Sequence, residues 1–266
     1  MRAALTPFYD PTSGTVAWVV ADPATGRAAL IDGVLGWVDG RIDPTPAIAL
    51  ADFVQANGLT VDWVLETHIH ADHVAGGRWL SQAVGGQLGI GEGVVEVQRA
   101  LAARAVKKTG GSATGFDVLF ADGQRLTLGS LEIEVLAVPG HTAGCVAYRV
   151  GDDLLVGDTL FMPDAGTARC DFPTGCAHRM WHSVRRLLEL APLTRLHHCH
   201  DYGQNDVRPP SFSSTATEQR AHNIHVRDGI DENAYVTMRQ ARDAHLAPPA
   251  LLDAAIRANL YGGVTE

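Results

Sequence analysis

Short apolar runs bounded by turn residues recur along the chain and predict β-strands. Thr15–Ala21 and Arg27–Asp32 are two such runs, and the Asp-Pro-Ala-Thr-Gly segment between them predicts a hairpin turn. Val61–Leu65 is a third run, which predicts a buried strand. The same pattern predicts further strands over Gln87–Ile90, Gln124–Leu128, Leu131–Val138, Cys145–Val150, Leu154–Val156 and Arg195–Cys199.

Between these runs lie segments whose apolar residues recur at helical spacing. Pro46–Asn57 is one of them, and it is followed by Gly58, a residue that favours helix ends. Further helices are predicted over Gly76–Val84, Val94–Val106, Gly175–Leu190 and much of Thr215–Leu260, with a loop over 109–115. Clustered strands with helices between them favour an α/β fold. We expect one domain, 1–266, with a helical C-terminal extension from about residue 212.

The composition is that of a globular protein. Of the 266 residues, 46% are hydrophobic and 19% are charged, which excludes a disordered chain. The formal net charge of -9 argues against nucleic acid bound on a broad basic surface, because that mode needs clustered Lys and Arg.

We expect a soluble cytoplasmic protein with no membrane partner. The first seven residues lack the apolar segment of a signal peptide, and no stretch approaches the roughly 20 apolar residues of a membrane helix. The sequence is compatible with a homo-oligomer. No C-x-x-C pair occurs among the cysteines, which favours reduced thiols at Cys145, Cys170, Cys176 and Cys199.

The densest group of candidate metal ligands lies directly after the predicted strand Val61–Leu65. It comprises three imidazoles and one carboxylate, at His68, His70, Asp72 and His73. If the strand continues to His70, then His68 and His70 point to the same face, because side chains alternate along a strand. Imidazole and carboxylate are ligands that divalent metals accept, so this stretch predicts a metal site.

Three single residues of the same types follow other predicted strands. They are His141 after Pro-Gly, Asp158 after Val-Gly, and His200 after the run that ends at Cys199. Loops at strand ends converge while the sheet holds them rigidly, so ligand-handling side chains often lie there. Together with the first group they make seven candidate ligands from four strand ends.

This pattern resembles the metallo-β-lactamase superfamily. The family signature H-x-H-x-D-H is matched over 68–73, and its later ligands are matched by His141, Asp158 and His200. The resemblance covers nearly the whole chain. It implies a four-layer αββα sandwich, in which two mixed sheets pack face to face, helices lie outside, and the metal site is at one edge.

A closer resemblance is to the persulfide dioxygenases of the ethylmalonic-encephalopathy-protein type and to a bacterial branch called β-lactamase-hydrolase-like. The matching segments are Pro139–Thr142, Arg169–Phe172, Gly175–Ala177, His182–Val184 and His200–Tyr202, and, for the bacterial branch, Ala165–Pro173 and Glu218–Asn223.

That resemblance implies one Fe(II) per chain, held by His68, His141 and Asp158, with open positions for a thiolate substrate and O₂. Two His and one carboxylate with open positions is the arrangement of non-haem Fe(II) oxygenases. The implied reaction oxidises glutathione persulfide, or a similar low-molecular-weight persulfide, to sulfite and thiol in sulfide detoxification. The remaining candidate ligands would orient the metal ligands and water through hydrogen bonds; they are His70, Asp72, His73 and His200.

Three further residues are candidates for substrate contact. Arg169 matches a family arginine near the site, and either pairs with a substrate carboxylate or fixes Asp171. Tyr202 and Arg220 are weaker candidates, for which packing and a helix-surface position are the alternatives.

Two other functions remain open from the sequence. In a glyoxalase II-like thioester hydrolase, all seven residues would bind two zinc ions, Asp158 would bridge them, and a metal-bound hydroxide would attack the carbonyl. A non-enzymatic metal or thiol sensor would use Cys170 or Cys199. The Arg169–Phe172 segment and the short C-terminal helices favour the dioxygenase, because they match that family and not the longer glutathione-binding tail of glyoxalase II.

Overall fold

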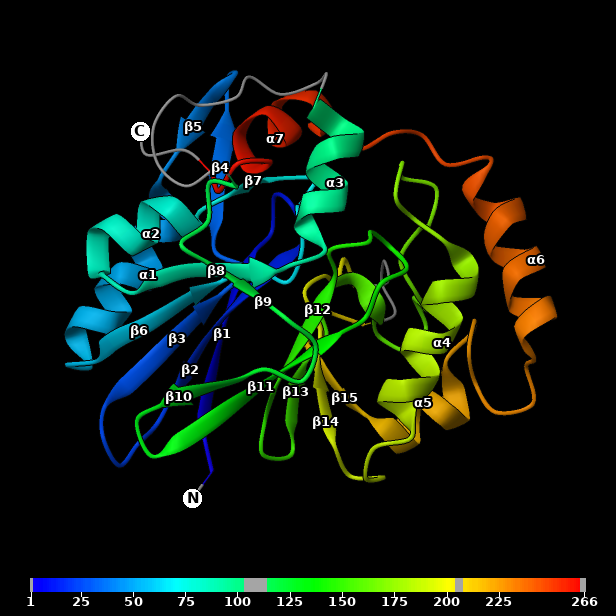
Figure 1. Cartoon of the computed structure of the whole chain (residues 1–266), viewed down its shortest axis with the longest axis horizontal. Coiled ribbons are helices and arrows are strands. Elements are labelled where there is room, and N and C mark those ends of the chain that lie inside the picture. Colours follow the sequence, from blue (N-terminus) through cyan, green and yellow to red (C-terminus); the bar gives the residue numbers. More distant parts are fainter. Residues whose placement is uncertain (1, 103–113, 204–207, 264–266) are drawn as a thin grey trace.

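Two six-stranded sheets form the centre of the molecule, in a computed structural model that describes residues 2–102, 114–203 and 208–263 (Figure 1). The first sheet has the order β1 (Ala4–Asp10), β2 (Thr15–Ala21), β3 (Arg27–Ile31), β6 (Thr60–Leu65), β8 (Gln87–Gly91) and β9 (Val118–Phe120). The second has the order β10 (Arg125–Leu128), β11 (Leu131–Ala137), β12 (Val146–Val150), β13 (Asp153–Leu155), β14 (Arg195–His197) and β15 (Ser213–Thr215). A small sheet joins β5 (Arg41–Asp43), β4 (Val34–Val38) and β7 (Val74–Ala75).

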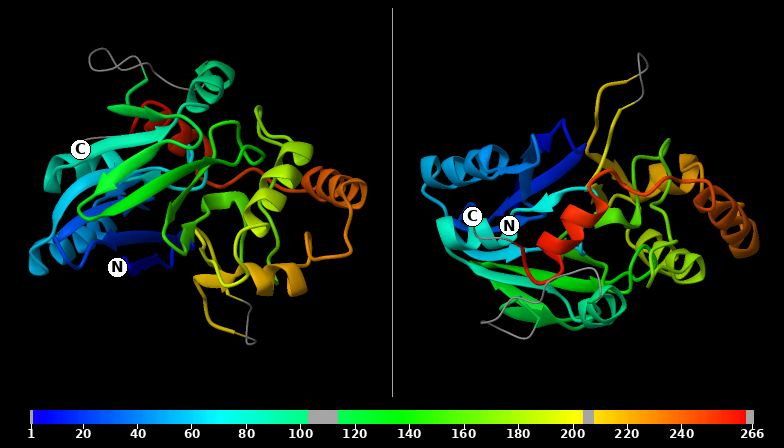
Figure 2. Two further views of the ribbon diagram at one scale, coloured as in Figure 1. Left: turned by 60° about the horizontal axis from the view of Figure 1, so that its bottom comes forward. Right: turned by 90° about the horizontal axis from the view of Figure 1, so that it is seen from above.

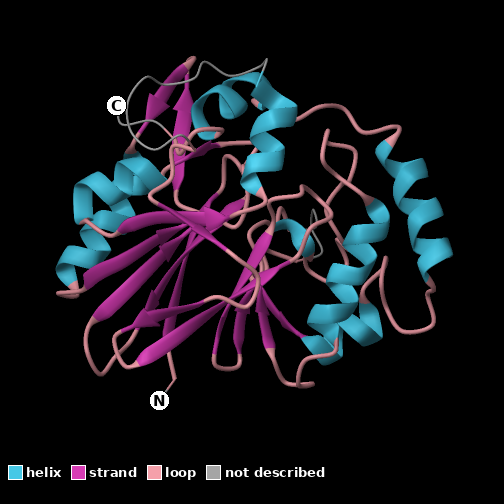
Figure 3. Cartoon of the chain, in the orientation of Figure 1, coloured by secondary structure: helices cyan, strands magenta, loops and turns pink. Residues whose placement is uncertain are grey.

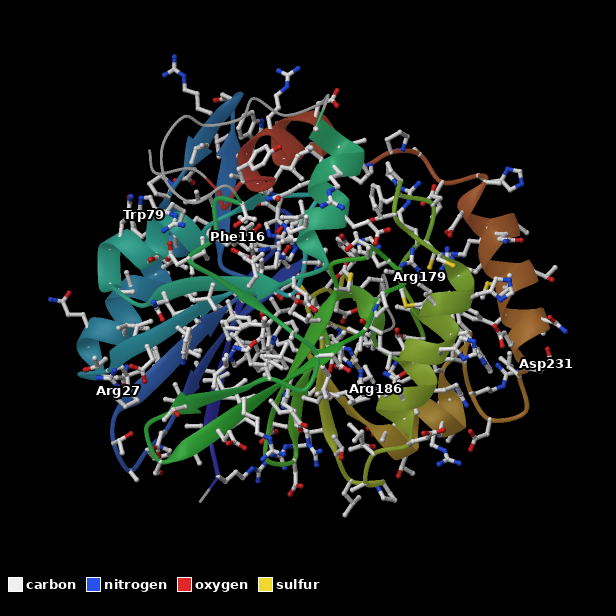
Figure 4. All side chains as sticks on the ribbon, viewed as in Figure 1. Arg27, Trp79, Phe116, Arg179, Arg186 and Asp231 are labelled. Atoms are coloured by element: carbon white, nitrogen blue, oxygen red, sulfur yellow. The ribbon has the colours of Figure 1, made fainter. Side chains whose placement is uncertain are left out.

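Strand β2 shows why the sheets pack face to face. All seven of its residues are buried, so both faces of the strand are covered. Trp18 and its neighbours two residues away lie in the core between the two sheets, together with Ile133 of β11. Ala17 and Val19 point the other way, into a core between the first sheet and its helices. Figure 4 shows side chains filling the space between the layers, whereas Arg27 and Asp231 lie at the periphery.

Helices cover the outer face of each sheet (Figures 2 and 3). The first sheet is covered by α1 (Thr45–Ala56), α2 (Gly77–Val84), α3 (Val94–Leu101) and α7 (Leu252–Asn259), which contribute Leu50, Leu80, Val97 and Ile256 to one core. The second is covered by α4 (Ala177–Leu188), α5 (Ala216–His222) and α6 (Glu232–Asp243), which contribute Met180, Ala216 and Tyr235 to another. The predicted αββα sandwich is therefore confirmed.

Several element boundaries differ from the sequence prediction. Strand β1 was not predicted, and it contains Pro7; it is an edge strand, where a missing N–H is tolerated. Strands β4 and β5 were also not predicted. Strand β6 ends at Leu65 and does not continue to His70, so His68 and His70 lie in the loop that follows the strand. Helix α3 ends at Leu101, and residues 103–106 of the predicted helix and 109–113 of the predicted loop lie outside the described residues.

The C-terminal segment from about residue 212, predicted as a helical extension, packs into the body of the domain. It begins with β15, which extends the second sheet, and it ends with α7, whose Ile256 and the following Leu260 enter the core of the first sheet. In Figure 1, α7 lies beside β7 and α3, on the opposite side of the molecule from α5. Across the described ranges, no helix combines the length and apolarity that crossing a membrane requires.

Candidate metal centre

Loops that follow four strands bring the seven predicted ligands together. They come after β6, β11, β13 and β14, and Asp158 lies in a 3₁₀ turn, Gly157–Thr159. All four loops leave the same edge of the sandwich, as the sequence pattern predicted. Six of the seven residues have a buried polar atom without a hydrogen-bond partner: His68 Nε2, His70 Nδ1, Asp72 Oδ2, His73 Nε2, Asp158 Oδ1 and His200 Nε2.

His68, His141 and Asp158 form one compact donor set. Asp158 Oδ2 lies 3.7 Å from His68 Nε2 and 3.8 Å from His141 Nε2. The two imidazole rings are 5.0 Å apart and nearly perpendicular, at 88°. One donor atom from each residue falls within 4.8 Å of the other two, which is the separation that a shared metal ion requires.

Hydrogen bonds fix which ring nitrogen of His68 is free. The Thr67 hydroxyl donates to Asp32 Oδ2 at 2.9 Å, so it accepts the proton of His68 Nδ1, which lies 3.0 Å away. Nε2 of His68 is then left unprotonated and faces Asp158. Burial, followed by the nearby His70 and His141, lowers the pKa of His68 well below its ordinary value, so the neutral, ligating form is favoured.

His141 is oriented in the same way by the main chain. Its Nδ1 lies 2.8 Å from the carbonyl oxygen of Arg169, and a carbonyl only accepts, so Nδ1 carries the proton and Nε2 is free. The ring of Phe172 meets that of His141 edge-on, with centroids 5.2 Å apart. The Arg169–Phe172 segment therefore holds His141 through one main-chain and one aromatic contact.

Two buried carboxylates contact the imidazole ring of His70. Its Nε2 lies 3.2 Å from both Asp32 Oδ1 and Glu66 Oε2. Burial opposes a charge on His70, but hydrogen bonds to the two carboxylates outweigh it and raise the pKa of His70 well above its ordinary value. Burial raises the pKa of Glu66 to about 7. With Nε2 engaged, Nδ1 is the nitrogen that His70 can offer to a metal once its proton has left.

A second donor set adjoins the first. Asp72, His73 and His200, together with His70, place one donor atom each within 4.8 Å of one another. His200 Nε2 lies 3.3 Å from Asp72 Oδ2 and 3.7 Å from Asp158 Oδ1. Asp158 therefore turns one oxygen to each set, and the donors suit one metal or two.

Thr15 supports the second set from strand β2. Its hydroxyl oxygen lies 3.2 Å from His73 Nδ1 and 3.4 Å from His200 Nδ1, and both Nε2 atoms are left free. Burial raises the pKa of Asp72, but His200 and His73 outweigh it and lower that pKa well below its ordinary value, so the carboxylate stays charged.

The donors fit a divalent metal. Buried polar atoms without a partner are costly unless something else satisfies them, and here six of them converge on one place. The free atoms are imidazole nitrogens and carboxylate oxygens, the donors that Zn²⁺ and Fe²⁺ accept. Imidazole and carboxylate donors do not by themselves select between these metals.

Several supporting residues were missed from the sequence. Asp32 accepts from the Thr67 main-chain N–H at 2.7 Å and has a φ of 52°, a left-handed conformation that Asp tolerates better than most residues. Asn259 of α7 donates to the carbonyl oxygens of His70 and His73, both at 2.8 Å, and accepts from the Ala75 N–H at 2.9 Å. The sequence signal for Asp32 was its place at the end of a predicted strand; Asn259 carried no such signal.

The three predicted substrate residues lie in different settings. The Arg169 guanidinium makes two 2.6 Å hydrogen bonds to Asp171, and a third, at 2.7 Å, to the Ala247 carbonyl. Tyr202 stacks on His200, with ring centroids 6.1 Å apart. Arg220 pairs with Asp228 beside a separate surface hollow and is not among the residues that line the pocket over the metal donors, so this structure gives its predicted substrate contact no support.

The two cysteines considered for a sensor are buried. Cys199 lies close to Asp158 and His200, where its sulfur adds a potential donor. Burial raises the pKa of Cys199 and that of Cys170 above the ordinary value. Both thiols therefore hold their protons at neutral pH, which disfavours a thiolate ligand or a reactive redox thiol in the metal-free protein.

A pocket of about 600 Å³ opens over the donors. Asp72, His141, Asp158 and His200 lie at its floor, and Phe161, Phe172 and Tyr202 are among its walls. This volume is typical of small-molecule sites, and much of the exposed lining is apolar.

Comparisons with known proteins agree with this geometry. A "Beta-lactamase hydrolase-like protein" of Xylella fastidiosa is 42% identical over 96% of the chain, which spans only 60% of that relative. "Glyoxylase B2" of Dictyostelium discoideum is 38% identical over 98% of the chain and 91% of the relative. Human "Persulfide dioxygenase ETHE1, mitochondrial" is 28% identical over 97% of the chain and 87% of the relative.

Among solved structures, ETHE1 from Myxococcus xanthus superposes with a TM-score of 0.79 at 26% identity, covering 98% of this chain and 100% of that one. The sequence profile of the Metallo-beta-lactamase superfamily matches residues 10–201, which include all seven candidate ligands. The chain therefore belongs to the metallo-beta-lactamase superfamily.

Proposed function

We propose that the protein is a persulfide dioxygenase that uses one Fe(II) held by His68, His141 and Asp158. The observation that carries the proposal is the geometry of this set: two imidazole nitrogens and one carboxylate oxygen within 4.8 Å, next to an open pocket. Such a set is typical of non-haem Fe(II) oxygenases. The end-to-end match to ETHE1 of Myxococcus xanthus supports it, because it includes the C-terminal helices.

The proposed substrate is glutathione persulfide or a similar small persulfide. The persulfide, O₂ and water would give the thiol and sulfurous acid, which ionises to sulfite; the outer sulfur is oxidised by four electrons and O₂ accepts them. Bound iron would supply the redox chemistry that brings O₂ and the sulfur together.

The chain's own residues would position the reactants. Thr67 and the Arg169 carbonyl hold His68 and His141 in the ligating tautomer, so no proton has to leave them before the metal binds. Phe161 and Phe172 line the pocket beside the donors and would present apolar surface to the reacting sulfur. No nucleophilic side chain is required.

The test of this function uses purified, iron-loaded protein with glutathione persulfide in an oxygen electrode. We expect O₂ uptake with sulfite as the product. Absence of O₂ uptake at one iron per chain would overturn the proposal.

A second candidate is a dinuclear thioester hydrolase. It is favoured by the second donor set, in which Asp72, His73 and His200 each have a free buried atom and Asp158 turns its Oδ1 toward His200. The name of the Dictyostelium relative, "Glyoxylase B2", also favours a hydrolase of this kind. Two zinc ions per chain with turnover of S-lactoylglutathione would favour this function over the dioxygenase.

A further inference from the structure

The pocket over the metal donors extends beyond them to the segment after α6. Its wall includes Leu246, Ala247 and Pro249 as well as the donors at its floor. A substrate whose sulfur reaches the donors therefore has its remaining atoms against α6 and the residues that follow it. The side chains on that part of the wall therefore contact the thiol carrier, the part of the substrate to which the sulfur is bonded.

Charged side chains on this wall, the metal donors aside, are paired with one exception. Asp164 is bound by Arg208 through two 2.7 Å hydrogen bonds. Arg169 is bound to Asp171, and the buried Arg239 to Asp243 at 2.8 Å. The exception is a cation at the C-terminal end of α6.

Arg242 lies in the last turn of α6 and is exposed. Among the described residues it makes no ion pair and no side-chain hydrogen bond, although its side chain lines the pocket. The chain has a formal net charge of -9, so an unpaired guanidinium on a pocket wall is a local positive charge on a protein that is negative as a whole. A guanidinium binds carboxylates through two parallel hydrogen bonds.

Apolar surface lies beside this cation. Tyr202, Ile224 and Leu246 are 70%, 46% and 39% exposed, and all three line the pocket. They are half of the six large hydrophobic side chains that are exposed in the described ranges. Exposed apolar side chains gathered at one pocket indicate ligand contact.

We propose that Arg242 binds a carboxylate of the thiol carrier, so that the pocket selects persulfides of acidic thiols over neutral ones. The inference rests on the proposed function, because the metal donors are taken as the place where the sulfur reacts. The carrier then has three parts: the sulfur at the floor, a body against Tyr202 and Ile224, and a carboxylate at Arg242. Glutathione and simple mercapto acids both have this chemistry.

The test measures binding without turnover. S-methylglutathione and its dimethyl ester, and 3-(methylthio)propionate and its methyl ester, are titrated into the purified protein by calorimetry. We expect at least one acid to bind more tightly than its ester. In Arg242→Gln that preference disappears, and the acid binds about five- to thirtyfold more weakly, the change that loss of a hydrogen-bonded charge pair produces. Arg242→Lys should retain part of the preference.

The control variant is Arg227→Gln. Arg227 is also exposed and makes no side-chain ion pair among the described residues, but it does not line the pocket. The control removes the same charge, and we expect unchanged binding. The proposal is overturned if neither acid binds more tightly than its ester, or if Arg242→Gln keeps the preference.

Turnover separates this inference from the proposed function. With glutathione persulfide, Arg242→Gln should raise KM and leave kcat nearly unchanged, because the interaction is made equally in the ground and transition states. O₂ uptake with the same KM in both proteins would refute the role of Arg242 and leave the dioxygenase standing. If Arg242→Gln loses the preference for the acid but the wild type consumes no O₂, the role of Arg242 is supported and the dioxygenase is refuted.

Discussion

His141 donates its Nδ1 proton to the main-chain carbonyl of Arg169 across 2.8 Å. The segment whose sequence favours the dioxygenase thus acts on the metal centre through its backbone, while the Arg169 side chain is bound to Asp171. The guanidinium anchors the segment, and the carbonyl selects the tautomer of His141. Arg169 therefore influences the metal centre through its backbone, whatever its side chain contacts.

His141→Ala should abolish metal retention and O₂ uptake together. The substitution removes one of three donors from the proposed iron set, and even residues that only support ligands change metal affinity by about 10–100-fold. Metal content after gel filtration and an oxygen electrode trace check this. His182→Ala is the control, since His182 is on the exposed surface of α4, with 70% of its side chain accessible. Activity preserved in His141→Ala would remove this residue from the metal set.

Asn259→Ala should weaken metal binding although Asn259 touches no metal. It leaves the carbonyls of His70 and His73 and the N–H of Ala75 without their partner. We expect a loss of about 2 kcal/mol in the free energy of unfolding and roughly tenfold weaker metal retention. Urea denaturation and competition with a chelator measure the two effects. Asn57→Ala, at the exposed end of α1, loses a single exposed hydrogen bond to the Phe53 carbonyl and should leave metal retention unchanged. Wild-type metal retention in Asn259→Ala would contradict the positioning role.

Asp72→Asn distinguishes one metal from two. In the proposed dioxygenase Asp72 is not an iron ligand, so metal content should stay near one per chain and O₂ uptake should fall only in part. In the dinuclear alternative the same change weakens the second site, and metal content should fall from two toward one. Elemental analysis of protein purified without added metal decides between them. Asp52→Asn, an exposed position on α1, should leave metal content unchanged in either case.

Acid should destabilise the fold partly through His225. Burial, and then the charges of Arg239 and Arg242, lower the pKa of His225 to about 4, from an ordinary value of 6.5. Between pH 6.5 and about pH 4, His225 therefore binds a proton in the unfolded chain but not in the folded chain. Unfolding free energy should fall as pH drops through that window, by up to about 1.4 kcal/mol per pH unit from this residue.

The measurement for His225 compares slopes. Urea denaturation of the wild type and of His225→Gln is followed from neutral pH down to the lower end of the window. The substituted amide would still offer an acceptor to the Thr167 N–H, which bonds His225 Nδ1 at 3.0 Å, but it does not titrate. We expect a shallower dependence on pH in the variant. Equal slopes in the two proteins would show that His225 takes up its proton in the folded state.

The sequence predicted what local patterns encode. The apolar runs at Thr15–Ala21 and before His68 are patterns of neighbouring residues, and both predicted strands are present. The seven candidate ligands at four strand ends were also visible in the sequence, and the family resemblance predicted that they form one metal site. The strand carrying Pro7 was missed because only its place at the sheet edge makes that proline acceptable.

Supports that act across the fold were not visible in the sequence. Asn259 contacts residues more than 180 positions away, and nothing in its neighbourhood distinguishes it from a helix-surface asparagine. Arg220 lies in a segment that matches the family, and only the folded chain shows that its guanidinium pairs with Asp228. For Arg169 the sequence left two chemically reasonable partners, a substrate carboxylate and Asp171, and the structure pairs its guanidinium with Asp171.

The link from α7 to the His70–His73 loop also sets an order of events during synthesis. A ribosome translates the metal loop early and Asn259 near the end of the described chain. A nascent chain stopped before α7 carries every donor residue but leaves their loop unclamped. Metal loading should therefore become firm only after α7 has emerged and docked, which makes stable metal uptake a report on the docking of α7.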